Sequence, residues 1–333
     1  MRCHQRTPCF APESPVMQII ESEVLFRPET AGLRFLPEGP YSNSEGIVSW
    51  VAIQHGGDSV VGSINQLDLA SGQNRSFSLH GRPGFAFPTT QAGIYIAGVE
   101  RQVGLWNTLT GTWTPLVSDV DHRVSNTIIN DGVLFENNVI FGCKDLEFKT
   151  QKAGLYLFRN SDRKLIALRK DQICSNGKAV IRDSTGQLWL YDIDSPTKTI
   201  VRYRLDIAAG TLSEAETVVD LTSDHVFPDG MIVTPDHQSL IVALYDPGDP
   251  DFGAARQYSL ADGTLQAIWT CAGSPRVTCP QLVMHEGRIR LLLTTAVEHM
   301  SPEQLSRHPN AGCLFIGDTP FHSLGDQPRY EFS

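Results

Sequence analysis

The stretch LIVALY at residues 240–245 is one of six short runs rich in β-branched and aliphatic residues. A run of this length, bounded by turn-forming residues, is typical of a β-strand. The six runs follow one another at intervals of 45 to 52 residues and begin at Ile47, Ile94, Val139, Leu188, Leu240 and Ile289. Because regular spacing of this length indicates a repeat architecture, we expect one strand-rich unit to occur six times.

A second apolar segment follows each run, and most of these segments end in a polar turn that contains glycine, as in ARQYSLADG at residues 255–263. Helical periodicity is scarce, and SPEQLSRH at 301–308 is the best short helix, with Ser301 as its N-cap. Six four-stranded units predict an all-β fold, a six-bladed β-propeller. A two-domain β-sandwich is the main alternative. Since no linker-like stretch divides the chain, we expect residues 17–333 to form one domain and residues 1–16 to be a disordered extension.

Composition excludes several classes of protein. The 333 residues carry a formal net charge of −10, which argues against a nucleic-acid partner because phosphate binding needs clustered lysine and arginine. No apolar run is long enough for a membrane helix, so no membrane partner is expected. The seven cysteines are odd in number and include no C-x-x-C pair, which favours reduced thiols in the cytoplasm. The oligomeric state stays open.

Short polar motifs recur at one phase of the repeat, just upstream of the strand runs, where loops are expected to enter the blades. They are LPEGP with Glu38, INDG with Asn130 and Asp131, SNGKAV with Asn176, FPDGMIV with Asp229, and VTCPQLV around Cys279. In a ring of blades, equal phase brings such residues together on the axis. Carboxylate and amide oxygens suit a hard divalent cation, Ca²⁺ foremost, with Mg²⁺, Mn²⁺ or Zn²⁺ possible. The alternative is that these are turn residues, because Asn-Gly and Asp-Gly pairs favour turns.

With these motifs the chain resembles the senescence marker protein (regucalcin)/gluconolactonase/luciferin-regenerating-enzyme family. The segments that carry the resemblance are LPEGPYSNSEGIVSWV, NDGVLFENNVIFG, GLYLFRN, ICSNGKAV, YDIDSPTKTIVRYRLD, FPDGMIV and HPNAGCLF. The resemblance implies a six-bladed propeller with one divalent metal ion on its axis, bound by Glu38, Asn176 and Asp229. It also implies that Asn130, supported by Asp131, faces the substrate and that Glu147 is an acidic substrate contact.

The function implied by the resemblance is that of a metal-dependent hydrolase that opens a lactone ring, with a sugar-type lactone as the small-molecule substrate. Asp229 is expected to act as general base on the attacking water, and Asn130 to orient the substrate. A phosphotriesterase-like hydrolase that uses the same metal site is a second hypothesis. A non-catalytic propeller that binds a metal or a ligand is the third.

Overall fold

The computed structural model describes residues 17–42 and 46–332, so the predicted extension at residues 1–16 lies outside the described part. Almost all its regular elements are strands. The helices are α1 (Ala31–Phe35), α2 (Pro302–Arg307) and the short 3₁₀ turn η1 (Ser195–Thr197). The helix predicted at 301–308 is confirmed, and Ser301 caps it by accepting a hydrogen bond from the Gln304 amide. None of the helices in this part of the chain has the length and apolar character needed to cross a membrane.

Three antiparallel sheets have four strands each, and in each the strands follow chain order. The first contains β2 (Pro37–Ser42), β3 (Ile47–Ala52), β4 (Ser63–Asp68) and β5 (Asn74–Ser78). The second contains β6 (Pro83–Pro88), β7 (Ile94–Val99), β8 (Gln102–Asn107) and β9 (Thr112–Val117). The third contains β10 (Thr127–Phe135), β11 (Asn138–Asp145), β12 (Ala153–Arg159) and β13 (Lys164–Gln172).

Two larger sheets complete the ring. One contains β14 (Ser175–Arg182), β15 (Leu188–Asp194), β16 (Thr199–Asp206), β17 (Thr211–Leu212) and β18 (Glu216–Asp220). The other has eight strands in the order β19-β20-β21-β22-β1-β25-β24-β23. Its strands are β1 (Gln18–Phe26), β19 (Phe227–Val233), β20 (Ser239–Tyr245), β21 (Phe252–Ser259), β22 (Leu265–Ala272), β23 (Val277–His285), β24 (Arg288–Thr295) and β25 (Leu314–Asp318).

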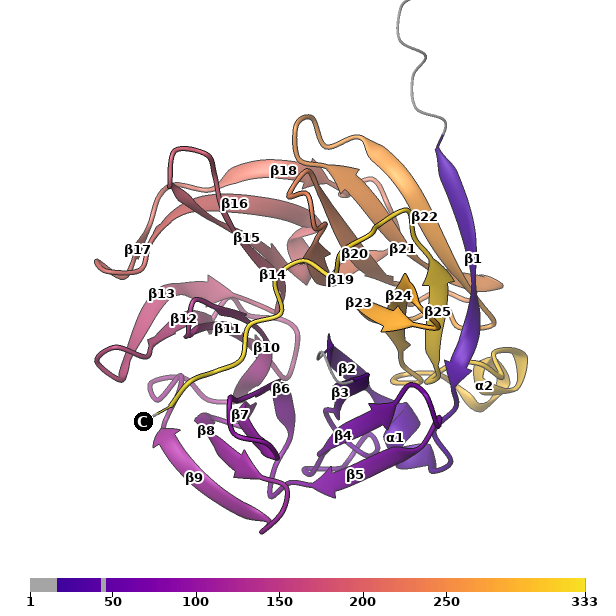
Figure 1. The fold of residues 1–333 in the computed structure, drawn as a ribbon, viewed down its shortest axis with the longest axis horizontal. Helices are drawn as coiled ribbons and strands as arrows, with labels where there is room; N and C mark the ends of the chain where they lie inside the picture. Colours follow the sequence, from indigo (N-terminus) through magenta and orange to yellow (C-terminus); the bar gives the residue numbers. More distant parts are fainter. Residues whose placement is uncertain (1–16, 43–45, 333) are drawn as a thin grey trace, which may run out of the picture.

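The sheets stand around a common axis, which confirms an all-β, propeller-like fold (Figure 1). The strands nearest the axis are β2, β6, β10, β14, β19 and β23. Aliphatic and aromatic side chains fill the spaces between the faces of neighbouring sheets. The five described cysteines are buried and free; they are Cys143, Cys174, Cys271, Cys279 and Cys313.

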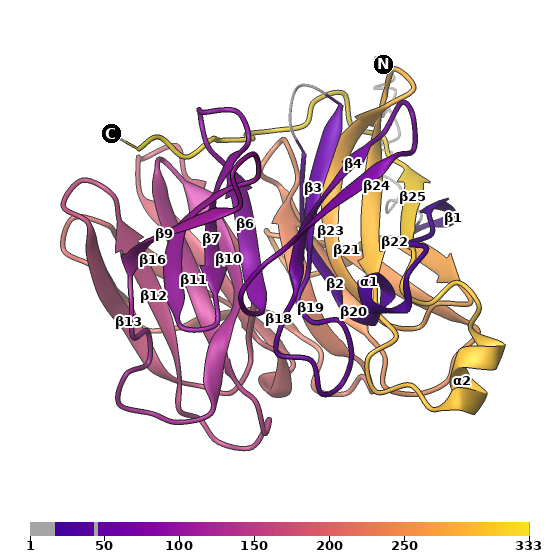
Figure 2. The same ribbon diagram turned by 90° about the horizontal axis from the view of Figure 1, so that it is seen from below.

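The segment after β25, residues 319–332, crosses the axis on one face of the ring and ends beside the second and third sheets (Figure 1). Figure 2 shows this segment along one face, with α2 at the opposite face. We call residues 319–332 the C-terminal strap. Its anchor is Tyr330, which is fully buried, donates its hydroxyl to Asn160 Oδ1 at 2.5 Å and bonds through its backbone to Pro88 and Thr90.

Candidate functional site

The four residues expected to share a site come from four of the strands nearest the axis. Glu38 lies on β2, Asn130 on β10, Asn176 on β14 and Asp229 on β19. Each is within the first four residues of its strand, so all four lie toward the same end of the channel. All are buried, with 6 to 9% of their surface exposed. The expectation that their motifs form loops or turns is wrong, because the motifs belong to the strands themselves.

A β-bulge lies at each site residue: Asn130 and Asp229 lie within one, and Glu38 and Asn176 are the last paired residues before one. The pairing of each inner strand with its neighbour shifts register at the site, between Glu38 and Tyr41 on β2 and between Asn176 and Lys178 on β14. The shift on β19 spans Asp229, and the shift on β10 spans Asn130. Because a bulge inserts residues without a ladder partner, it turns their side chains out of the normal alternation.

The glycines of these motifs allow the inner strands to approach each other. A Cβ atom at Gly177 would lie 2.6 Å from the backbone oxygen of Asp229, and one at Gly230 would lie 2.6 Å from Cys279 Sγ. Neither glycine has a positive φ, so the reason for glycine at both positions is space and not turn geometry. Close strand contact at the axis therefore explains why Asn176 and Asp229 each precede glycine.

Hydrogen bonds fix the two amides. Asn130 Nδ2 donates to Asn176 Oδ1 at 2.7 Å and to the Ser175 carbonyl at 3.0 Å. Asn176 Nδ2 donates to Ser195 Oγ at 2.8 Å, and this hydroxyl donates to the Pro228 carbonyl at 2.6 Å. These bonds connect β10, β14 and β19, and they leave the second lone pair of Asn176 Oδ1 available to a further partner.

The two carboxylates repel one another in a buried place. Burial raises the pKa of Glu38 well above its usual value, and the negative charges of Asp229 and Asp131 raise it further. Burial likewise raises the pKa of Asp229, with a further contribution from Asp131. Among the described residues, the Asp229 carboxylate accepts no hydrogen bond and that of Glu38 accepts one, from the Gly39 amide at 3.3 Å.

The donor set fits a divalent cation of the oxygen-preferring kind. Two buried, poorly hydrogen-bonded carboxylates and an amide oxygen are the groups that Ca²⁺ or Mg²⁺ takes, and a cation would offset their repulsion. Within the described ranges, no group of three or more His, Cys, Asp or Glu residues could hold a metal ion. The site of Glu38, Asn176 and Asp229 differs from such a group in having only two carboxylates.

The remaining predicted residues lie on different sides of this centre. Asp131 accepts a hydrogen bond from the Gly132 amide at 2.7 Å and lines a cavity on the strap side. Burial raises the pKa of Asp131, and the nearby charge of Lys178 opposes this. Glu147 is exposed on the loop that follows β11, where Asn126 Nδ2 donates to its carboxylate at 2.9 Å. Glu147 therefore lies at the end of the channel where the inner strands begin.

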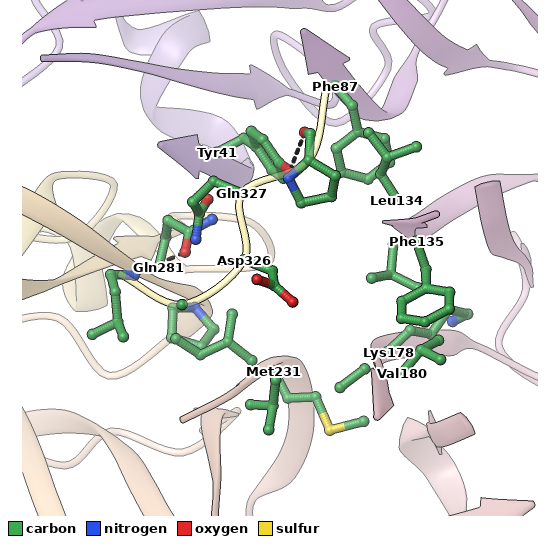
Figure 3. A pocket seen from close by; sticks show the side chains of 18 of the residues that line it. Tyr41, Phe87, Leu134, Phe135, Lys178, Val180, Met231, Gln281, Asp326 and Gln327 are labelled. Carbon is green, nitrogen blue, oxygen red and sulfur yellow. Dashed lines mark hydrogen bonds between the residues drawn. The ribbon is translucent and has the colours of Figure 1, made fainter. Parts of the chain in front are cut away.

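The cavity on the strap side has a volume of about 620 Å³ and is lined mainly by apolar residues. Figure 3 shows Tyr41, Phe87, Leu134 and Met231 around it, with Asp326 of the strap pointing into it. The strap is tied across this end by the hydrogen bond from the Tyr41 hydroxyl to the Pro328 carbonyl, at 2.6 Å. We therefore take the other end, where Glu147 lies, as the entrance to the site, and call it the site mouth.

Sequence reasoning missed several charged or polar residues near the centre. Lys144 is buried at the end of β11, and Glu298 lies close enough for its charge to raise the pKa of Asp229. Ser195 bridges β14 and β19, as described above. A lysine within the apolar run VIFGCKD was the one available signal, because lysine is rarely buried in a strand without a function or a partner.

The fold and the site define a β-propeller protein with a buried, acidic and oxygen-lined centre. Within that class, the chain belongs to the SMP-30/Gluconolactonase/LRE-like family, whose model matches residues 36–297. This finding confirms the resemblance seen in the motifs.

Similar proteins cover different shares of the chain. An uncharacterized protein of Sulfolobus acidocaldarius and the "Putative sugar lactone lactonase YvrE" of Bacillus subtilis are both 30% identical, over 48% and 52% of this chain. Each match spans 56% of the relative's own length. Regucalcin of Danio rerio is 25% identical over 65% of this chain and 74% of its own.

Two solved structures share the fold. The calcium-binding protein regucalcin from Agrobacterium tumefaciens superposes with a TM-score of 0.78 at 21% identity, covering 95% of this chain and 100% of its own. A luciferin-regenerating enzyme superposes with a TM-score of 0.71 at 16% identity, covering 88% of this chain and 95% of its own. At these identities the likeness supports the propeller fold and not a particular reaction.

Proposed function

We propose that this protein is a divalent-metal-dependent lactonase. The observation that carries the proposal is the meeting of two buried carboxylates, Glu38 and Asp229, with the amides of Asn130 and Asn176 on the propeller axis. Family membership and the name of the Bacillus subtilis relative, a putative sugar lactone lactonase, support a lactone as the substrate class. Glu38, Asn176 and Asp229 would hold the metal ion, and the all-oxygen donor set favours Ca²⁺ over Zn²⁺.

The bound ion would supply Lewis-acid polarisation of the lactone carbonyl oxygen. Asp229 accepts a proton from the water that attacks the carbonyl carbon, and this proton passes to the ring oxygen as the carbon–oxygen bond breaks. The products are a free hydroxyl and a carboxylic acid, which keeps the second proton of the water and releases it to solvent to become a carboxylate. Asn130 donates its N–H groups to Asn176 and Ser175, so its Oδ1 is the group that can accept from a substrate hydroxyl.

We also propose that the blades number six. The eight-stranded sheet divides at β1, whose first half pairs in parallel with β22 and whose second half pairs antiparallel with β25. Counted this way, the eight-stranded sheet is two blades, one made of β19–β22 and the other of β23–β25 with β1. The three four-stranded sheets and the β14–β18 sheet are the other four blades. The whole described chain would then be one propeller domain.

Lactone hydrolysis by the chelator-treated protein tests the proposal. We expect no turnover of D-gluconolactone until Ca²⁺, Mg²⁺, Mn²⁺ or Zn²⁺ is restored, and we expect Asp229→Ala to abolish both turnover and metal binding. Asp58→Asn, which removes an exposed carboxylate, is the matched control. Hydrolysis retained by Asp229→Ala would refute the mechanism. Metal-dependent turnover of paraoxon in place of lactones would favour the phosphotriesterase hypothesis.

A further inference from the structure

Lys144 is a buried cation beside the proposed site, and no carboxylate of the described residues forms an ion pair with it. It is 5% exposed, about as buried as the site residues themselves. Two other lysines near this part of the ring are paired, Lys178 with Asp192 at 3.3 Å and Lys152 with Asp145 at 2.9 Å. Within residues 17–42 and 46–332, no hydrogen bond or ion pair to the Lys144 ammonium is found. Because a buried charge without a partner is costly, its retention needs a reason.

The position of Lys144 points toward the substrate side of the site. It is the last residue but one of β11, and the loop that follows it forms part of the site mouth. Its backbone pairs with Cys174, which directly precedes β14 and the Asn176 motif. Burial raises the pKa of Glu38, Asp229 and Cys174, and the charge of Lys144 opposes this rise in each, so the ammonium lies within electrostatic reach of all three.

The loop beside Lys144 is held in a fixed and strained shape. The Asp145 carboxylate accepts hydrogen bonds from the amides of Glu147, Lys149 and Thr150, at 2.9 to 3.1 Å. This wrapping places Phe148 at φ +52°, a conformation that is costly for a bulky residue. The Phe148 ring is 47% exposed, and the Lys144 ammonium lies 5.8 Å from its centroid. Strain of this kind is common at ligand-binding positions.

We infer that Lys144 is a specificity-determining residue that binds a carboxylate carried by the lactone, with Phe148 as an apolar wall of the same subsite. The inference rests on the proposed lactonase function and narrows its substrate class to lactones with a second, ionised acid group. The ammonium donates to that carboxylate, and the resulting charged hydrogen bond supplies the partner that Lys144 lacks.

Two lactones separate this inference from the proposed function. D-glucarolactone carries a free carboxylate, whereas D-gluconolactone is neutral. For the Ca²⁺-loaded wild type we expect a higher kcat/KM on D-glucarolactone. Lys144→Met should lower the ratio of the two kcat/KM values by on the order of ten- to a hundredfold, chiefly through the KM of D-glucarolactone. Lys144→Arg should largely keep the ratio, because it keeps the charge.

Lys149→Met is the matched control, since it removes an exposed lysine five residues further along the same loop and should leave the ratio as it is. An unchanged ratio in Lys144→Met, or an equal loss on both lactones, would overturn the inference but not the lactonase function. If neither lactone is hydrolysed, the proposed function fails, and glucarate binding measured by calorimetry still decides the role of Lys144. Equal glucarate affinity in wild type and Lys144→Met would then refute it. Circular dichroism checks that Lys144→Met is folded. If it is not, Lys144→Gln takes its place in the same measurements.

Discussion

Removing the negative charge of Asp229 should make the metal-free protein more stable. The Asp229 carboxylate is buried, accepts no hydrogen bond from the described residues and is repelled by Glu38 and Asp131. Asp229→Asn keeps the shape and removes the charge. Replacing a buried ion pair with neutral residues of similar volume is neutral or stabilises proteins by about 1–4 kcal/mol, and we expect a gain in this range here because Asp229 has no ion-pair partner among the described residues. An unfolding entropy of about 2 cal/mol/K per residue converts this range into an increase in Tm of roughly 1–6 °C.

The sign of this effect depends on pH in a way that identifies its cause. The pKa of Asp229 is raised in the folded protein, so the folded state holds the proton more tightly than the unfolded state. The penalty of ionisation is therefore absent below the ordinary pKa of an aspartate, about 4, and develops as the pH rises through the raised value. We expect the difference in Tm between Asp229→Asn and wild type to be largest at neutral or higher pH and to vanish in acid.

Calcium should reverse the order of stability. An ion whose free concentration is a hundred times its Kd stabilises the folded state by about 2.7 kcal/mol. The wild type should gain this stability, and Asp229→Asn should gain little. Thermal unfolding followed by circular dichroism measures the Tm of each protein in chelator and in Ca²⁺. Asp58→Asn serves as the surface control. If Asp229→Asn is the less stable protein in chelator at neutral pH, the carboxylate has a stabilising partner and our account of the site is wrong.

Three further predictions concern the packing around the site. Gly177→Ala should lower the free energy of unfolding by about 1–3 kcal/mol, because its Cβ would lie 2.6 Å from the Asp229 carbonyl oxygen. Gly57→Ala is the control and should melt like wild type, because a Cβ there would have nothing within 4 Å. Tyr330→Ala should lower the free energy of unfolding, measured with denaturant, by about 3–5 kcal/mol, because it removes the fully buried anchor of the strap. Leu109→Ala is the control and should change this free energy very little, because Leu109 is 82% exposed. Ser195→Ala should weaken calcium binding by about tenfold in titration calorimetry, since it frees the Asn176 amide; unchanged affinity would remove Ser195 from the site.

The repeat was predictable because each unit contains an apolar run that forms one strand whatever its neighbours are. Such runs begin at Ile94, Leu188 and Leu240. In the structure Ile94 and Leu188 are the first residues of strands, and Leu240 is the second residue of one. The grouping of Glu38, Asn176 and Asp229 could be predicted for the same reason. They occupy equivalent positions in the repeat, and equivalent positions lie at the same height along the axis. Periodicity could not show that these residues lie inside strands, because Asn-Gly and Asp-Gly are ordinary turn signals.

Contacts that depend on distant pairing could not be predicted from local pattern. The segment QIIESEVLF at residues 18–26 alternates as a strand should, but nothing in it shows that one half pairs with β22 and the other with β25. The same holds for Tyr330, whose partners lie about 170 and 240 residues earlier in the chain. Lys144 is a different case, because its place within an apolar run was the one sequence signal for it. Its importance follows from the missing partner, which is a property of the fold and not of the sequence.

The distance along the chain between the carboxylates couples the site to closure of the ring. Glu38 lies on the first inner strand and Asp229 on the fifth, and the chain between them passes through three complete sheets. The direct connection between them runs the other way, through β23, which packs against both β2 and β19. β1 reinforces that connection, because it pairs with both β22 and β25 and so joins the two parts of the eight-stranded sheet. A cation bound by Glu38 and Asp229 would therefore act across the point where the ring closes, and the repulsion between the two carboxylates would oppose closure without it.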